Sequence, residues 1–176
     1  MSNAEVKKVI LLYPIDHYQK ITALLKAKKY KEVVDTCDIV IERMKGKNSL
    51  FVAYSTGVAY FSLENYAKAK TAFESALNYD AEHMNSLRYL SEIGIRMDDS
   101  KLTKLYLSKI IAKEKRDQSP DLVRDYKKLL KVYDSEGNSK EVVAILQEIL
   151  FIPDLSHENR DGALLKYSEY LVITRN

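Results

Sequence analysis

The stretch GVAYFSLENYAKAKTAFESAL, residues 57–77, decides the fold. Small and large residues recur in it at the intervals of three and four that place them on one face of a helix. The tripeptide LEN interrupts the pattern, and Asn65 is a residue type that caps helix N-termini. The sequence therefore predicts two helices joined by a tight turn. The members of the series are Gly57, Tyr60, Tyr66, Ala69, Phe73 and Ala76.

The wider unit, residues 50–81, is a helix–turn–helix of about 34 residues, the length of a tetratricopeptide repeat (TPR). It resembles that family in the six residues just named, although Ala53 stands where the family has a tryptophan. We interpret Gly57 and Ala69 as positions that let the two helices approach closely. Tyr60 and Phe73 then fill the space between this hairpin and its neighbours.

Flanking segments repeat the pattern more loosely. Residues 16–44 match it with an offset of 36, and residues 84–114 with an offset of 34. The expected counterparts are Tyr30, Val33, Cys37 and Val40 before it, and Ser91, Ser100, Thr103 and Leu107 after it. In residues 122–154 the second-helix series continues through Val142, Leu146 and Ile149.

These matches predict an all-α protein, and the TPR resemblance implies a right-handed α-solenoid. The expected hairpins are residues 15–48, 49–82, 83–118 and 119–154. Residues 1–14 would form a lead-in or an extra helix, and residues 155–176 a capping helix. Local signals predict N-caps at Ser100 and at Ser119, with Pro120 opening a helix. Gly137 suits the position after a helix, and NSKE (138–141) reads as a capping box.

Composition excludes several classes of protein. Of 176 residues, 46% are hydrophobic and 30% charged, which suits a packed domain with a charged surface. A net charge of +3 is too weak to indicate a nucleic-acid partner. The apolar run at residues 9–13 is too short to span a bilayer, and it lacks a signal-peptide cleavage site. We therefore expect no membrane span and a cytoplasmic protein.

The residue types that could act as nucleophiles, acid–base groups or metal ligands do not form a catalytic constellation. The histidines His17, His83 and His157 lie far apart and share no metal-ligand spacing. Cys37, the one cysteine, falls on the inward stripe of its helix and is expected to be a buried thiol. Of the carboxylate pairs, Asp98/Asp99 reads as a turn that complements a helix N-terminus, and neither it nor Glu141/Glu148 indicates an acid–base pair across a cleft. We expect no enzyme, no cofactor and no metal site.

The candidate binding site is the concave face that the TPR resemblance assigns to the first helices. Its early half is mainly aromatic and its later half basic, which suits a protein or peptide partner with apolar and acidic residues. A plainer interpretation makes the early aromatics core and the basic run a solvated helix face. The site residues are Tyr18, Thr22, Phe51, Tyr54, Val58, Phe61, Arg88, Arg96, Arg124, Lys127 and Lys131.

Three functions remain open at this point. The first is a non-enzymatic scaffold that binds a protein segment on the concave face. The second is a solenoid that binds single-stranded RNA. The low net charge of the chain makes nucleic-acid binding the less favoured of these functions. The third is self-association, as a homodimer, through the apolar stretch LLKYSEYLVI (164–173) in the C-terminal helix.

Chaperone-binding TPR domains hold a C-terminal carboxylate with a Lys/Asn/Arg clamp, and this chain does not reproduce the clamp. The corresponding positions hold Tyr18, Thr22, Ser55, Asn85 and Tyr89, or, in the next register, Tyr54, Val58, Tyr89, Arg124 and Lys128. We predict that a chaperone C-terminal tail peptide does not bind in a fluorescence-anisotropy titration. A micromolar Kd would contradict this prediction.

Overall fold

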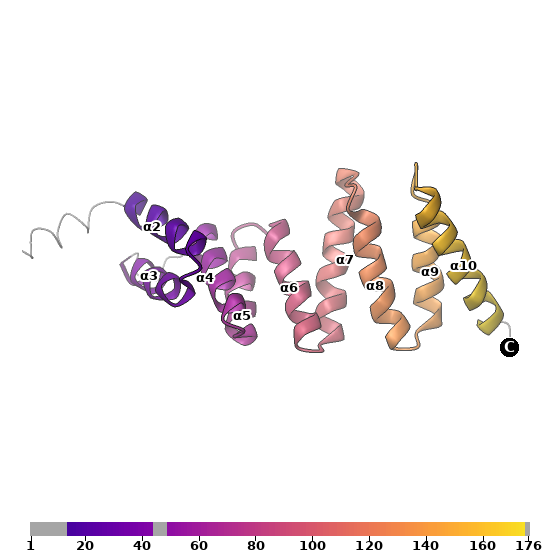
Figure 1. Cartoon of the computed structure of the whole chain (residues 1–176), viewed down its shortest axis with the longest axis horizontal. Helices are drawn as coiled ribbons and strands as arrows, with labels where there is room; N and C mark the ends of the chain where they lie inside the picture. The colour runs from indigo at the N-terminus through magenta and orange to yellow at the C-terminus, as the bar shows by residue number, and fades with distance from the viewer. Residues whose placement is uncertain (1–13, 44–48, 175–176) are drawn as a thin grey trace, which may run out of the picture. The chain divides into compact units, whose positions relative to one another are not determined.

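The computed structural model describes residues 14–43 and 49–174. Residues 1–13 of the expected lead-in, which include the apolar run at 9–13, lie outside the described residues. Within the described ranges the chain forms nine α-helices and no strand (Figure 1). The predicted all-α class is therefore confirmed.

The chain divides into two compact units, Met1–Met97 and Asp98–Asn176. The boundary falls in the turn of the third expected hairpin, so its two helices belong to different units. The helices of the first unit are α2 (Pro14–Lys26), α3 (Tyr30–Arg43), α4 (Leu50–Ser62), α5 (Tyr66–Leu77) and α6 (Met84–Arg96). Those of the second are α7 (Ser100–Asp117), α8 (Leu122–Ser135), α9 (Ser139–Leu150) and α10 (His157–Thr174).

Consecutive helices pack against each other within each unit. In the first unit α2 also contacts α4, so the first helices of its first two hairpins are neighbours. This nearest-neighbour pattern is what stacked helical hairpins produce, because no single hairpin can bury both of its apolar faces.

Buried residues occupy the same three positions in every second helix. In α5 these are Ala69, Phe73 and Ala76, and their side chains are 0% exposed. Burial of one large apolar side chain stabilises the fold by about 1.5–3 kcal/mol, so this stripe is a main source of stability. The buried counterparts are Val33, Cys37 and Val40 in α3, Thr103, Leu107 and Ile110 in α7, and Val142, Leu146 and Ile149 in α9.

Helices α4 and α5 approach each other closely at Gly57. A Cβ atom built at Gly57 would lie 2.7 Å from ring carbons of Phe73, closer than such atoms are found. The Phe73 ring therefore rests directly on the backbone of α4, and only glycine leaves room for it. This confirms that Gly57 is needed for close helix packing.

The turns between first and second helices share one geometry. Lys28, Glu64, Asp98 and Gly137 each have a positive φ, between 53° and 67°. In the fourth hairpin, the N–H of Gly137 donates to the carbonyl of Asp134 and that of Asn138 to Tyr133, both at 3.0 Å. This is the Schellman pattern, and the first two hairpins repeat it at Lys28 and Glu64. The expected role of Gly137 is confirmed.

The predicted N-cap of α5 is confirmed, and that of α7 lies one residue earlier than predicted. Asn65 caps α5, since its Oδ1 accepts from the N–H of Lys68 at 3.2 Å. The cap of α7 is Asp99, not Ser100, because Asp99 Oδ1 accepts from the N–H of Leu102 at 2.9 Å.

Two further helix starts differ from the prediction. The capping box at residues 138–141 is wrong, because the N–H of Asn138 is already donated to Tyr133 in the Schellman turn. The helix expected to open at Pro120 begins at Leu122. Ser119 instead accepts from the N–H of Asp121 at 3.2 Å, in a turn that precedes the helix.

The shared turn geometry predicts opposite effects of two exchanges. A non-glycine residue in the left-handed region loses about 1–2 kcal/mol. Glu64→Gly is therefore expected to raise the free energy of unfolding by about 1 kcal/mol, and Gly137→Ala to lower it by a similar amount. Urea denaturation followed by circular dichroism measures both. Equal stability of the two variants would contradict the assignment of these turns.

Candidate functional site

No group of three or more His, Cys, Asp or Glu side chains among residues 14–43 and 49–174 could hold a metal ion. His17 contacts Arg43, with 2.7 Å between Nε2 and the guanidinium, and burial next to that cation lowers the pKa of its imidazole. His83 lies 2.8 Å from the hydroxyl of Ser86. His157 is exposed at the start of α10. The three histidines thus have separate surroundings.

Cys37 is a buried thiol, as expected. It is 0% exposed, and burial raises the pKa of its thiol. A thiol in that setting is poorly reactive, because the nucleophile is the thiolate.

An aromatic face in the first unit carries most of the early candidate residues. Tyr18 of α2 and Phe51 of α4 make an edge-to-face contact, with ring centroids 5.0 Å apart and an interplanar angle of 88°. Such pairs add about 0.5–1.5 kcal/mol to the free energy of area burial and fix the rings in place. The contact therefore joins the first helices of two successive hairpins on one face.

A second set of rings surrounds Tyr89 of α6. Its ring stacks on Phe73, with centroids 4.7 Å apart and an interplanar angle of 9°. Phe61 of α4 meets it edge-on at 5.0 Å, and Tyr54 at 6.1 Å. Tyr54 also contacts His83 at 5.1 Å. Tyr89 thus connects the aromatic face to the Gly57–Phe73 contact.

Tyr89 was missed as a member of the aromatic face. The predicted site residues included Arg88 but not Tyr89, although Tyr89 was among the positions compared with the chaperone clamp. The signal that could have identified Tyr89 is that it is an aromatic residue next to a predicted site position, Arg88.

The candidate residues are all at least partly exposed. In the first unit Thr22, Phe51 and Arg96 are exposed, with Phe51 at 36%. The half-exposed members are Tyr18, Tyr54, Val58, Phe61 and Arg88. The aromatic face is thus a partly open surface whose rings contact one another.

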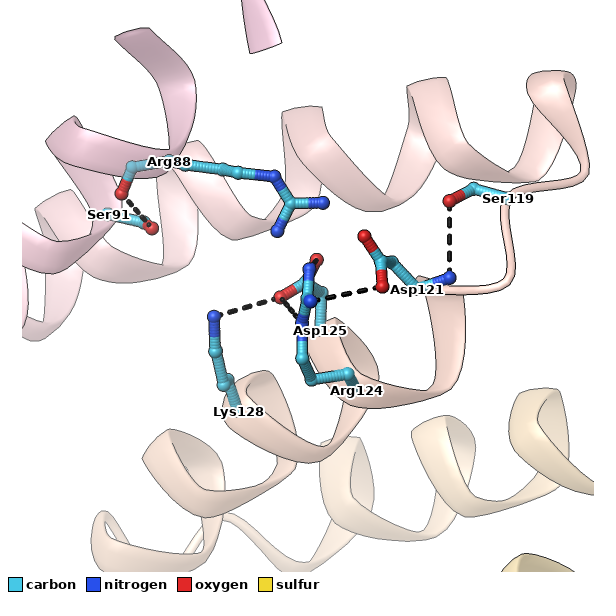
Figure 2. A network of polar contacts seen from close by, with 7 residues as sticks. All are labelled: Arg88, Ser91, Ser119, Asp121, Arg124, Asp125 and Lys128. Atoms are coloured by element: carbon cyan, nitrogen blue, oxygen red, sulfur yellow. Dashed lines mark hydrogen bonds and ion pairs between the residues drawn. The ribbon is translucent and has the colours of Figure 1, made fainter. Parts of the chain in front are cut away.

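Basic candidates of the second unit have local partners (Figure 2). Arg124 pairs with Asp121 at 3.0 Å and with Asp125 at 3.3 Å, and Lys128 pairs with Asp125 at 3.0 Å. Asp125 is fully buried, and an unpaired buried carboxylate would destabilise the fold. Arg124 and Lys128 therefore compensate the buried charge of Asp125. Lys127 donates to Asn159 of α10 at 2.6 Å. Lys131 is exposed.

Basic candidates on α6 belong to the first unit. Arg96 pairs with Glu92 on its own helix at 2.9 Å. Figure 2 also shows Ser91, whose hydroxyl donates to the backbone carbonyl of Arg88 at 2.8 Å. The basic candidates Arg96 and Arg124 therefore each have an acidic partner within their own unit.

Polar contacts hold α10 against α8 in the second unit. Asp134 accepts from the ammonium of Lys166 and from the hydroxyl of Tyr170. The hydrogen bond from Lys166, and to a smaller extent the one from Tyr170, lowers the pKa of the Asp134 carboxyl. The opposite side of α10 leaves apolar side chains exposed, at Leu164, Leu165 and Val172.

Tyr126 makes a similar contact between α8 and α9. Its hydroxyl donates to Glu148, and Lys115 of α7 pairs with the same carboxylate at 3.0 Å. Burial and this hydrogen bond raise the pKa of Tyr126 to about 12. The hydrogen bond in turn lowers the pKa of Glu148.

Comparison with known proteins supports the fold only. No protein-family model and no curated protein sequence matches the chain. Among solved structures, MamA 41-end from Desulfovibrio magneticus RS-1 superposes with a TM-score of 0.62 at 16% identity, covering 90% of this chain and 93% of that one. TPR-like repeats of a putative kinesin light chain from Podosopora anserina give 0.60 at 16%, covering 88% and 83%.

A second MamA structure, MSR-1 C2, gives a TM-score of 0.55 at 13% identity and covers 92% of this chain and 96% of that one. Similarity at this level of identity establishes a TPR-like fold and leaves the function to the site. No helix in the described part of the chain is long and apolar enough to cross a membrane.

The lowered pKa values of Asp134 and Glu148 predict an acid-labile second unit. A carboxyl with a depressed pKa in the folded state stabilises the fold above its unfolded pKa and loses that effect as the pH falls. We expect the free energy of unfolding to decrease as the pH falls below about 4.5, the ordinary value for Glu148.

Urea denaturation of the whole chain at a series of pH values tests this, with Asp134→Asn as the variant. The variant should show a weaker dependence on pH in the acid range. Asp161→Asn, on the exposed side of α10, is the matched control and should keep the dependence of the unchanged chain. An identical pH profile for Asp134→Asn would contradict the prediction.

Proposed function

We propose that this chain, which has the fold of TPR-like proteins, is a non-enzymatic scaffold that binds a peptide or protein segment on the aromatic face of its first unit. The observation that carries the proposal is the line of partly exposed rings on α2, α4 and α6. Tyr and Trp are enriched in binding hot spots, and rings already held by edge contacts lose little freedom on binding.

The side chains of the aromatic face suggest which residues the bound segment carries. Phe51 and Val58 offer apolar surface, and Arg96 at the end of α6 is exposed. A segment with an apolar anchor followed by an acidic residue would suit both. We propose a cytoplasmic location, with which the free, buried Cys37 is compatible.

Peptide display on the whole chain, followed by titration of the selected peptides, tests the proposal. Phe51→Ser is expected to weaken their binding at least tenfold. Phe151→Ser is the matched control, because Phe151 is an even more exposed phenylalanine, 85% exposed, in the second unit. Peptides whose affinity is unchanged by Phe51→Ser would contradict the aromatic face as the site.

Self-association is a second candidate function, favoured by the exposed Leu164, Leu165 and Val172 of α10. A homodimer through this helix would bury them. Light scattering that gives a monomer at high concentration would dismiss it.

RNA binding is less favoured, since the basic side chains of both units are interleaved with carboxylates. It would appear as affinity for a single-stranded oligonucleotide that falls steeply with salt.

A further inference from the structure

A pocket of about 500 Å³ lies in the first unit between α3, α4 and α5. Pockets that hold ligands are about 300–1,000 Å³ in volume. Its lining includes Ala53 and Tyr60 from α4, and Ala72 and Ser75 from α5. None of the residues of the aromatic face lines it, so it is a separate feature.

The repeat register shows which side chain this pocket lacks. Ala53 lies eleven residues before Glu64, the positive-φ residue of its turn. Eleven residues before the corresponding turn residue, the first, third and fourth hairpins have a larger side chain: His17, Leu87 and Tyr126. Of the four hairpins, the second alone has a methyl group there, at Ala53, which is 1% exposed on the floor of this pocket.

The fourth hairpin shows what a ring does at this position. Tyr126 is 3% exposed, and its hydroxyl donates to Glu148 of α9. Glu148 lies eleven residues after Gly137, and Ser75 lies eleven residues after Glu64. Ser75 lines the pocket. The acceptor position for a tyrosine hydroxyl therefore has a counterpart in the second hairpin, with a serine in place of the carboxylate.

Other groups at the pocket favour a ring over an aliphatic chain. Tyr60 supplies an aromatic neighbour, and the ammonium of Lys68 lies over its ring at 5.3 Å from the centroid. Lys68 is exposed, and an incoming ring beside Tyr60 would share this cation, since ammonium groups attract aromatic faces.

We propose that the pocket receives a tyrosine side chain of a partner protein, in the place that Tyr126 fills within the second unit. The ring packs beside Tyr60 and Ala72, above the buried floor at Ala53, and the phenol donates to the hydroxyl of Ser75. A single ring and one hydrogen bond give weak affinity, so the tyrosine anchors a larger contact, as tyrosines at protein interfaces do.

Titration of the whole chain with N-acetyltyrosinamide, followed by methyl NMR, tests the proposal. The methyl groups of Ala72 and Thr71 are expected to shift, with a Kd of about a millimolar. Ala53→Tyr fills the pocket from within and should abolish the shifts. Ala72→Leu, which narrows the pocket at a half-buried position, should do the same if Ala53→Tyr does not fold.

Ser75→Glu recreates the acceptor that Tyr126 has, and it should tighten binding by about fivefold, because hydrogen bonds to charged groups are stronger. N-acetylleucinamide should bind at least fivefold more weakly than the tyrosine probe. Phe51→Ser should leave the Kd unchanged, so that failure of this site and failure of the aromatic face can be told apart.

Several results would overturn the proposal. These are equal binding of the leucine probe, or binding that persists when both Ala53→Tyr and Ala72→Leu are folded. Binding of p-cresol more than tenfold tighter than the capped tyrosine would assign the pocket to a small phenol. The same methyl shifts on raising the protein concentration alone would assign it to a second copy of this chain.

Discussion

The packing of the Phe73 ring on the backbone at Gly57 is the contact on which the first unit depends. It brings α4 and α5 together, and Tyr89 of α6 stacks on the same ring. Three helices thus meet at one aromatic side chain that no water reaches. Because interiors are close-packed, a single added methyl group at Gly57 would have to move the ring or the helix.

The same rule of small against large accounts for both candidate sites. Where a ring has a small partner, as at Gly57, the two helices pack closely. At Ala53 a small residue has no large partner, and a pocket is left. In the second unit the corresponding position holds Tyr126, and a hydrogen bond to Glu148 takes the place of the pocket.

Periodicity predicted the helices, the buried stripe and the turn at Gly137, because those features depend on residues that are neighbours in the chain. It did not predict the cap at Asp99, since Asp99 and Ser100 are both good caps and only the backbone geometry chooses between them. Nor did it predict that Arg124 and Lys127 are paired, because their partners Asp125 and Asn159 are set by packing and by a helix 32 residues away.

A double-mutant cycle between Gly57→Ala and Phe73→Leu tests the central contact most directly, with the free energy of unfolding as the readout. Gly57→Ala alone should lower it by about 1–3 kcal/mol. With Leu at position 73 the added methyl group has room, so the loss in the double variant should fall short of the sum by about 1 kcal/mol or more. Losses that add within about 0.5 kcal/mol would contradict the contact.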